Sequence, residues 1–129
     1  MPLAEHVKVI EGVARHFNAG ALDRLGEFLS PALGGFQRDL ATWRLAFPDA
    51  VFKIDDMIGE GNKVVDRFTI TGTHLGSFAG VKPTGRRVAV AGITMVTIEG
   101  GRIVERWGLT DQLGLLQQLG ALPAGLSGR

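Results

Sequence analysis

The sequence predicts an α+β domain in which three N-terminal helices cover one face of a curved antiparallel sheet. Two observations predict this class. Apolar residues recur every three or four positions in the first third of the 129-residue chain, which is the period of helices packed on a core. From residue 51 onward the apolar period falls to about two, the period of strands, and glycine-rich turns separate the segments. The length fits a single domain over residues 1–129.

Three helices are expected before the sheet. The first has one apolar stripe at helical spacing, made of Leu3, Val7, Ile10, Ala14 and Phe17. It is expected to end at residues 18–20, where Asn and Gly are typical helix stops. A shorter helical segment covers residues 22–29. The third helix covers residues 36–47, because Pro48 cannot continue it.

Four strands should follow, at residues 51–58, 63–74, 87–99 and 102–111. Glycine-rich turns separate the first pair and the last pair, so each pair is expected to form a hairpin. A loop of residues 76–86 joins the two hairpins, and a last helix covers residues 112–119.

The strand at 87–99 is apolar on both of its faces. One face carries Val88, Val90, Val96 and Ile98, and the other carries Ala89, Ala91, Ile93 and Met95. Because three helices can cover only one face of such a sheet, we expect the other face to pack against a second subunit and form a homodimer.

The charge balance argues against nucleic acid or a membrane as a partner. Fourteen Lys and Arg against 13 Asp and Glu give a net charge of +1, which is too weak to steer a polyanion. No apolar run reaches the roughly 18 residues of a membrane span, and residues 1–8 lack the pattern of an export signal. A cytoplasmic location and a small, uncharged ligand are therefore expected.

The residue types that are missing limit the chemistry. With no Cys there is no thiolate nucleophile, and with no Tyr there is no phenolic acid. His6, His16 and His74 do not have metal-ligand spacing with a carboxylate, and the first two lie off the apolar stripe, where solvent is expected. We therefore expect neither a metal nor an organic cofactor.

Residues 102–111 are predicted to form a strand that ends on a carboxylate. Alternation puts Trp107, Leu109 and Asp111 on one face, which we expect to look into an apolar hollow between the sheet and its helices. An aspartate beside apolar walls loses hydration, so its pKa rises and it becomes a better general base. The alternative is a helix N-cap, because Asp111 immediately precedes the last helix.

Several fragments together resemble the SnoaL-like polyketide and ester cyclases of the nuclear-transport-factor-2-like (NTF2-like) superfamily. They are Phe47-Pro48-Asp49, Gly72-Thr73-His74 with Gly76 and Phe78, Pro83-Thr84-Gly85-Arg86, residues 101–105 with Trp107 and Asp111, and Gln118-Leu119-Gly120. Each fragment alone is weak, and their order and spacing are specific. The resemblance implies a cone of helices and a strongly bent antiparallel (mixed) sheet around an apolar pocket, often in a dimer through the outer sheet face.

The resemblance also implies a chemistry. Known members include cofactor-free enzymes that close a polyketide ring by intramolecular aldol condensation, with an aspartate at the position of Asp111. Some relatives serve instead as hydroxylation components, so membership alone does not fix the reaction. Two departures bear on the substrate. Segment 28–36 is shorter and more apolar than in most members, and Thr97 stands where many relatives have an arginine.

Two further polar residues are candidates for the site. His74 ends a strand before the 76–86 loop and is expected near a pocket mouth, where it could bond a substrate oxygen or accept its proton. The alternative is a partly exposed histidine at the loop edge that bonds the backbone. Arg67 lies in mid-strand and could point inward, with Glu105 or Asp111 as its partner. The alternative for Arg67 is an ion pair at an interface or on the surface.

An aromatic wall is the candidate for holding a planar ligand. Trp43, Phe47 and Trp107 could form it, or they could be ordinary core residues. Met95 and Thr97 complete the predicted substrate-binding set.

Together these features predict a cofactor-free cyclase or isomerase for a carbonyl-bearing, polyketide- or ester-like small molecule. Asp111 would be the general base and His74 a donor or acceptor. One rival is hydrolysis of an epoxide or lactone, but Thr69 stands two residues after Arg67, where relatives that open epoxides have an aspartate. The other rivals are a hydroxylation component and a module that binds a small molecule without turnover, which the apolar segment 28–36 favours.

Overall fold

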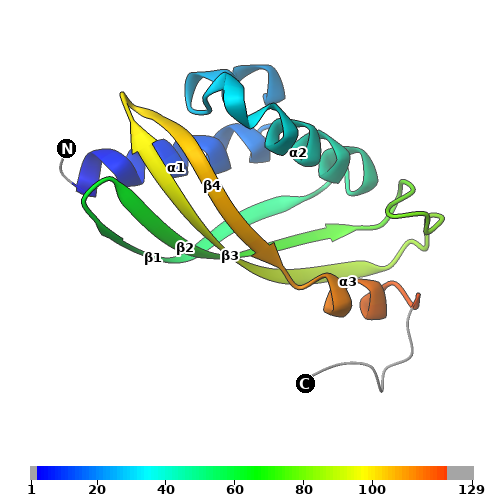
Figure 1. The fold of residues 1–129 in the computed structure, drawn as a ribbon. Coiled ribbons are helices and arrows are strands. Elements are labelled where there is room, and N and C mark those ends of the chain that lie inside the picture. The colour runs from blue at the N-terminus through cyan, green and yellow to red at the C-terminus, as the bar shows by residue number, and fades with distance from the viewer. Residues whose placement is uncertain (1–2, 122–129) are drawn as a thin grey trace.

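The structure is a computed structural model that describes residues 3–121, so the expected domain bounds at 1 and 129 lie outside it. The fold is α+β, as predicted, with helices on one face of a four-stranded sheet (Figure 1). Before the sheet come α1 (Leu3–Asn18), the 3-10 helices η1 (Leu22–Glu27) and η2 (Pro31–Leu33), and α2 (Gly34–Ala46). The strands are β1 (Val51–Glu60), β2 (Lys63–Thr73), β3 (Arg87–Glu99) and β4 (Arg102–Thr110), and α3 (Gln112–Gln118) follows them.

The sheet is an antiparallel meander in the order β1-β2-β3-β4. Gly100 and Gly101, with φ of 59° and 78°, form the turn between β3 and β4 that the predicted hairpin requires. The register shifts between Ile54 and Asp56 in β1, and such bulges bend a sheet. In Figure 1 the sheet curves beneath α1 and α2, and α3 lies at its far end.

Helix α1 packs on the sheet through a stripe that is shifted from the expected one. Its buried residues include His6, Val9, Ile10, Ala14 and Phe17. Positions 6, 9, 10 and 17 lie on one helical face, so His6 is directed into the core and the expectation that it is solvated is wrong. His16 is half-buried, and its Nδ1 lies 2.8 Å from a backbone carbonyl oxygen in the same helix.

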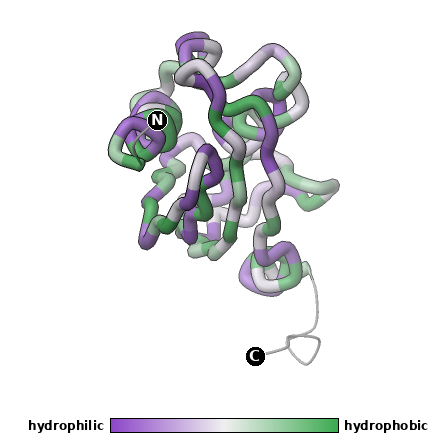
Figure 2. Tube along the Cα trace, turned by 60° about the vertical axis from the view of Figure 1, so that its left-hand side comes forward, coloured by the Kyte–Doolittle hydropathy of each residue, from purple (hydrophilic) through white to green (hydrophobic). Residues whose placement is uncertain are grey.

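The two faces of the sheet differ in burial. The inner face carries core residues from β2 and β3, namely Val64, Phe68, Ile70, Val88, Val90 and Val96. On the outer face of β3, Ala89, Ala91, Ile93 and Met95 are exposed. The predicted alternation along β3 is therefore confirmed, and Figure 2 shows hydrophobic and hydrophilic positions interspersed along the strands.

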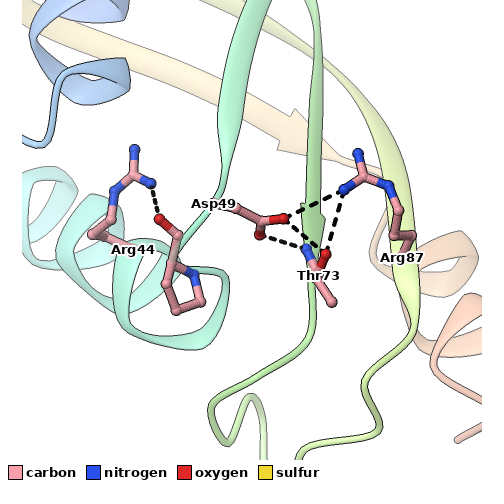
Figure 3. Close-up of polar contacts among 5 residues, drawn as sticks. Arg44, Asp49, Thr73 and Arg87 are labelled. Atoms are coloured by element: carbon pink, nitrogen blue, oxygen red, sulfur yellow. Dashed lines mark hydrogen bonds and ion pairs between the residues drawn. The ribbon is translucent and has the colours of Figure 1, made fainter.

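Arg44 holds the C-terminal end of α2 to the chain around it (Figure 3). Its Nη1 donates to the carbonyl of Pro48 at 2.6 Å. Its Nη2 donates to the carbonyls of Phe17 and Ala50, at 2.6 and 3.1 Å. The guanidinium carbon also lies 4.5 Å from the centre of the Phe17 ring, so Arg44 makes both polar and aromatic contacts.

Asp49 joins the segment before β1 to the end of β2 (Figure 3). Its Oδ1 accepts the Thr73 backbone N–H at 2.7 Å, and its Oδ2 accepts the Thr73 hydroxyl at 2.8 Å. Arg87 Nη1 lies 3.3 Å from the same Oδ2. These bonds, the backbone N–H first, lower the pKa of Asp49.

Candidate functional site

A cavity of about 540 Å³ lies between α2 and the inner face of the sheet. Its aromatic lining consists of Phe36, Trp43, Phe52, Phe68 and Phe78. Its polar lining comes from α2, β4 and α3 and consists of Asp39, Thr42, Arg106, Thr110 and Gln112. An apolar pocket with a few polar groups is the usual form of a small-molecule site. We call it the inner cavity.

The aromatic rings of the inner cavity contact one another. Trp43 stacks on Phe47 with ring centroids 5.0 Å apart, and its ring centroid lies 5.3 Å from that of Phe78. Across β1 and β2, the rings of Phe52 and Phe68 stack at 4.6 Å. Rings held in this way offer fixed faces to a planar ligand.

Arg106 is the cationic group of the inner cavity. Its guanidinium carbon lies 3.9 Å from the centre of the Phe36 ring. The guanidinium also lies over Gly108, where an added Cβ would be 2.6 Å from Nη2. Within residues 3–121 nothing accepts a hydrogen bond from Arg106, although a guanidinium has five N–H donors. Burial lowers the pKa of Arg106, and the charges of Asp66 and Asp39 oppose that shift.

Asp66 is a buried carboxyl group on the inner face of β2, only 3% exposed. It lies in register with Thr94 of β3, which in turn lies in register with Gly108 of β4. Thr94 Oγ1 donates to Oδ2, whereas the buried Oδ1 has no hydrogen-bond partner. Burial raises the pKa of Asp66, and the Thr94 bond and the Arg106 charge oppose the rise. The two charged groups form no ion pair within 4.0 Å, so they attract without contact.

His74 is fully buried and is not at a pocket mouth, so its expected position is wrong. Its Nδ1 accepts the Thr84 N–H at 3.1 Å, so in the neutral ring the proton is on Nε2. Its backbone N–H donates to the Arg86 carbonyl, and its carbonyl accepts the Gly85 N–H, each at 2.9 Å. His74 therefore closes the base of the loop that carries Phe78. The alternative was right about the backbone bond and wrong about partial exposure.

Asp111 is the N-cap of α3, because its Oδ1 accepts the Gly114 N–H at 2.9 Å. Its chain neighbours Thr110 and Gln112 line the inner cavity, but Asp111 lines a depression on the outer sheet face. The N-cap alternative is thus confirmed, and the expected position in the hollow between sheet and helices is wrong. Asp111 and Trp107 do lie on the same face of the sheet, as predicted, but that face is the outer one.

That open depression on the outer face of β2, β3 and β4 has a volume of about 740 Å³. Its large apolar residues are Ile93, Met95, Trp107 and Leu109. Trp107 is 69% exposed there, so the expected wall of Trp43, Phe47 and Trp107 is wrong, because the sheet separates Trp107 from the other two. Met95 also belongs to this outer depression.

Arg67 and Thr97 lie on the outer face as well. Arg67 Nη1 is 4.0 Å from Asp55 Oδ2, so its partner is neither of the two carboxylates predicted from the sequence, and the surface alternative is confirmed. Thr97 Oγ1 donates to Glu105 at 3.0 Å and accepts from Lys63 Nζ at 2.7 Å. Neither residue lines the inner cavity.

Arg106 and Asp66 were not among the residues predicted from the sequence. The signal for both lies in strand alternation. Alternation places Arg106 on the same strand face as Gly108 and Thr110. It places Asp66 on the same face as the buried Phe68. A charged residue at a buried strand position is informative, because burying a charge is costly unless a partner compensates it.

No group of three or more His, Asp or Glu side chains in residues 3–121 is arranged to hold a metal ion. None of the described helices is long and apolar enough to cross a membrane. The absence of a cofactor and the cytoplasmic location stay predictions.

The helices, the curved antiparallel sheet and the cavity between them define an NTF2-like fold, which the solved structures below share. The chain belongs to the SnoaL-like polyketide cyclase family, whose model matches residues 8–119. The resemblance stated from the sequence is therefore confirmed.

Three solved structures from Streptomyces are similar to the chain. TsrD of Streptomyces laurentii is 29% identical with a TM-score of 0.88, and the match covers 95% of this chain and 99% of TsrD. AclR of Streptomyces galilaeus, a proposed hydroxylase, is 27% identical with a TM-score of 0.87, over 95% of this chain and 89% of AclR. IdmH of Streptomyces antibioticus, a proposed polyketide cyclase, is 29% identical with a TM-score of 0.80, over 89% and 98%. A comparison with curated proteins gave no match.

Proposed function

We propose that the protein is a cofactor-free cyclase or isomerase that acts on a carbonyl-bearing, polyketide- or ester-like small molecule in the inner cavity. The inner cavity is the observation that carries the proposal, because aromatic rings line it and a few polar groups converge on it. Family membership and the likeness to IdmH, a proposed polyketide cyclase, support the same reaction class.

The proposed reaction needs no co-reactant. An aspartate takes a proton from a carbon next to a carbonyl, and the C–H electron pair moves into the resulting enolate. The enolate carbon then attacks a second carbonyl of the same molecule and forms the C–C bond of the ring. The alkoxide that results takes the proton back from the aspartic acid, so the catalyst returns to its starting state.

Asp111 is the base that the family resemblance implies, and we propose it on that ground. Its chain neighbours Thr110 and Gln112 line the inner cavity, so its backbone lies at the edge of that cavity while its side chain is directed to the outer face. In the structure, however, its Oδ1 accepts the Gly114 N–H at 2.9 Å. To act in the inner cavity the side chain has to leave its cap position. His74 is fully buried and has no part in the proposal.

Asp111→Asn tests the base, because Asn can keep the N-cap while it cannot accept the proton. Purified protein is incubated with a panel of linear poly-β-ketone esters, and cyclised product is followed by liquid chromatography and mass spectrometry. We expect the variant to lose at least about 100-fold in rate. Asp23→Asn, at an exposed position of η1, is the matched control and should keep full activity. Turnover that survives in a folded Asp111→Asn protein contradicts the assignment.

A hydroxylation component is the second candidate, favoured by the likeness to AclR, a proposed hydroxylase, at 27% identity. The mass of the product separates the two. Ring closure leaves the mass unchanged or lowers it by one water, whereas hydroxylation adds one oxygen. Products that gain oxygen would replace the cyclase proposal, and binding of the panel with no product would favour a module that only binds.

We also propose that two copies pack together through the outer sheet face. Ile93, Met95, Trp107 and Leu109 form an exposed apolar surface there, which is costly to leave in water. Light scattering after size exclusion should give the mass of a dimer, and Trp107→Lys with Leu109→Lys should give a monomer. Leu45→Lys, at an exposed apolar position on α2, is the control that should stay dimeric. A monomeric wild-type protein at low micromolar concentration contradicts the proposal.

A further inference from the structure

We infer that the inner cavity binds its ligand through a negatively charged oxygen, that Arg106 receives this oxygen, and that a charged Asp66 weakens the binding. The ligand class is then a planar or aromatic molecule with an acidic hydroxyl conjugated to a carbonyl, as in an enol or a phenol. This assignment rests on the proposed function, because both use the inner cavity. It differs from the uncharged ligand that the overall charge of the chain predicts.

Arg106 has hydrogen-bond donors for which residues 3–121 provide no acceptor. No residue of the described range accepts from its guanidinium, yet the side chain is half-buried and lines the cavity. A cation in such a place is costly, because burial removes water that would solvate it. An oxyanion on the ligand removes that cost, and the apolar surroundings strengthen the attraction.

The contact with Phe36 limits where those donors point. The ring lies 3.9 Å from the guanidinium carbon, and Gly108 leaves room for the group over the strand. The N–H groups lie in the plane of a guanidinium and point outward from its edge. Trp43 and Phe68 offer aromatic faces in the same cavity. One planar molecule can therefore contact these faces and place an oxygen against Arg106.

Two carboxyl groups attract Arg106, Asp66 from β2 and Asp39 from α2. Asp39 is exposed, so water and salt screen its charge. Asp66 is 3% exposed, and its Oδ1 has no hydrogen-bond partner, so little screens its charge. An oxyanion on Arg106 is repelled by a charged Asp66. Neutralising Asp66 should therefore strengthen the binding of an anion.

2-Hydroxyanthraquinone tests the inference, because its visible spectrum distinguishes the phenol from the phenolate. Anthraquinone has the same rings without the hydroxyl and serves as the neutral probe. We expect the wild-type protein to bind the phenolate at least about tenfold more tightly than the phenol, read from a titration of the bound probe between about pH 5 and pH 9.

Variants assign the effect to residues. Arg106→Met keeps an apolar stem against Phe36 and should lose the phenolate preference while anthraquinone binding stays the same. Arg102→Met, at an exposed position of the same strand, should keep the preference. Asp66→Asn should increase the preference for the phenolate above that of the wild-type protein, because it removes the carboxyl group whose charge repels the anion. A structural role for Asp66 would not raise the preference.

The outcomes separate this inference from the proposed function. Equal binding of phenol and phenolate, or a preference that survives Arg106→Met, overturns the inference and leaves the cavity as a ligand site. If neither probe binds the wild-type protein, the cavity is not such a site and both proposals fall. A phenolate preference in Asp66→Asn that is unchanged or smaller overturns the role of Asp66.

Circular dichroism checks the folding of each variant. If Arg106→Met does not fold, Arg106→Lys is the second variant, and it should keep part of the phenolate preference.

Discussion

Two arginines of this chain contact phenylalanine rings, and they differ in what accepts their hydrogen bonds. Arg44 lies 4.5 Å from the Phe17 ring and donates to three backbone carbonyls. Arg106 lies 3.9 Å from the Phe36 ring and donates to no residue of the described segment. Burial lowers the pKa of both guanidinium groups, so burial does not separate them. The acceptors separate them. Backbone carbonyls accept from Nη1 and Nη2 of Arg44 and leave its buried Nε without a partner, whereas nothing in residues 3–121 accepts from Arg106, whose donors are left for another molecule.

Replacing each arginine by methionine tests this comparison most directly. Arg44→Met leaves three carbonyls without their donor and should lower the free energy of unfolding by about 3 kcal/mol. Arg106→Met breaks no hydrogen bond to the described residues and should change the free energy of unfolding by less than about 1 kcal/mol. Urea unfolding followed by circular dichroism measures both at neutral pH. Similar losses in the two variants would remove the distinction between a structural and a ligand-binding arginine.

The pH dependence of Asp66 sharpens the comparison with an intermediate effect. Burial raises its folded-state pKa above the unfolded value, so the folded chain holds the proton more tightly. Its contribution to stability therefore falls as the pH rises from the unfolded pKa through the folded pKa. Asp66→Asn removes this pH-dependent loss of stability, because Asn carries no charge. The variant should therefore raise the free energy of unfolding at neutral pH by about 1 kcal/mol.

The gain from Asp66→Asn should shrink as the pH falls through the raised folded-state pKa and should be gone below the unfolded value of about 4, where the wild-type carboxyl is protonated in both states. Urea unfolding at a series of pH values measures it. A variant that is less stable than wild type at neutral pH would mean that the Thr94 bond outweighs the cost of burial.

Asp49, which lies near Arg44 in Figure 3, should give the smallest effect. The bonds from Thr73 lower its pKa, so its charged form stabilises the fold above the unfolded pKa, and this is lost as the pH falls through the folded pKa. Because Asp49 is exposed, water screens its charge, and Asp49→Asn should cost less than about 0.5 kcal/mol at neutral pH. Thermal unfolding at neutral and acidic pH measures the change, and a cost as large as that of Arg44→Met would contradict this ranking.

The fold followed from the sequence because its signals are local. The helix that ends before Pro48 and the Gly100-Gly101 turn depend on neighbouring residues alone, and both are present in the structure. Strand β3 has the predicted bounds for the same reason, since its alternation is long and regular. Helix η1 is a 3-10 helix of six residues, shorter than the predicted segment 22–29.

The site was harder to predict because alternation tells which residues share a face and not which face is inward. Trp107 and Asp111 do share a face, but both faces of the sheet carry apolar residues, and the aromatic ring of Trp107 suggested the wrong one. Arg106 lies at the opposite parity, on the inner face of the sheet. Its contact with Phe36 joins β4 to α2, and no pattern within one strand reports a contact between distant segments.

The hydrogen atom that serves as the side chain of Gly108 has a consequence for redesign. A methyl group there would meet the Arg106 guanidinium at 2.6 Å, so the flexible arginine would have to shift its end group away from the strand. Substituting larger residues at this one backbone position would thus displace the positive charge from its place over the strand without changing any charged residue.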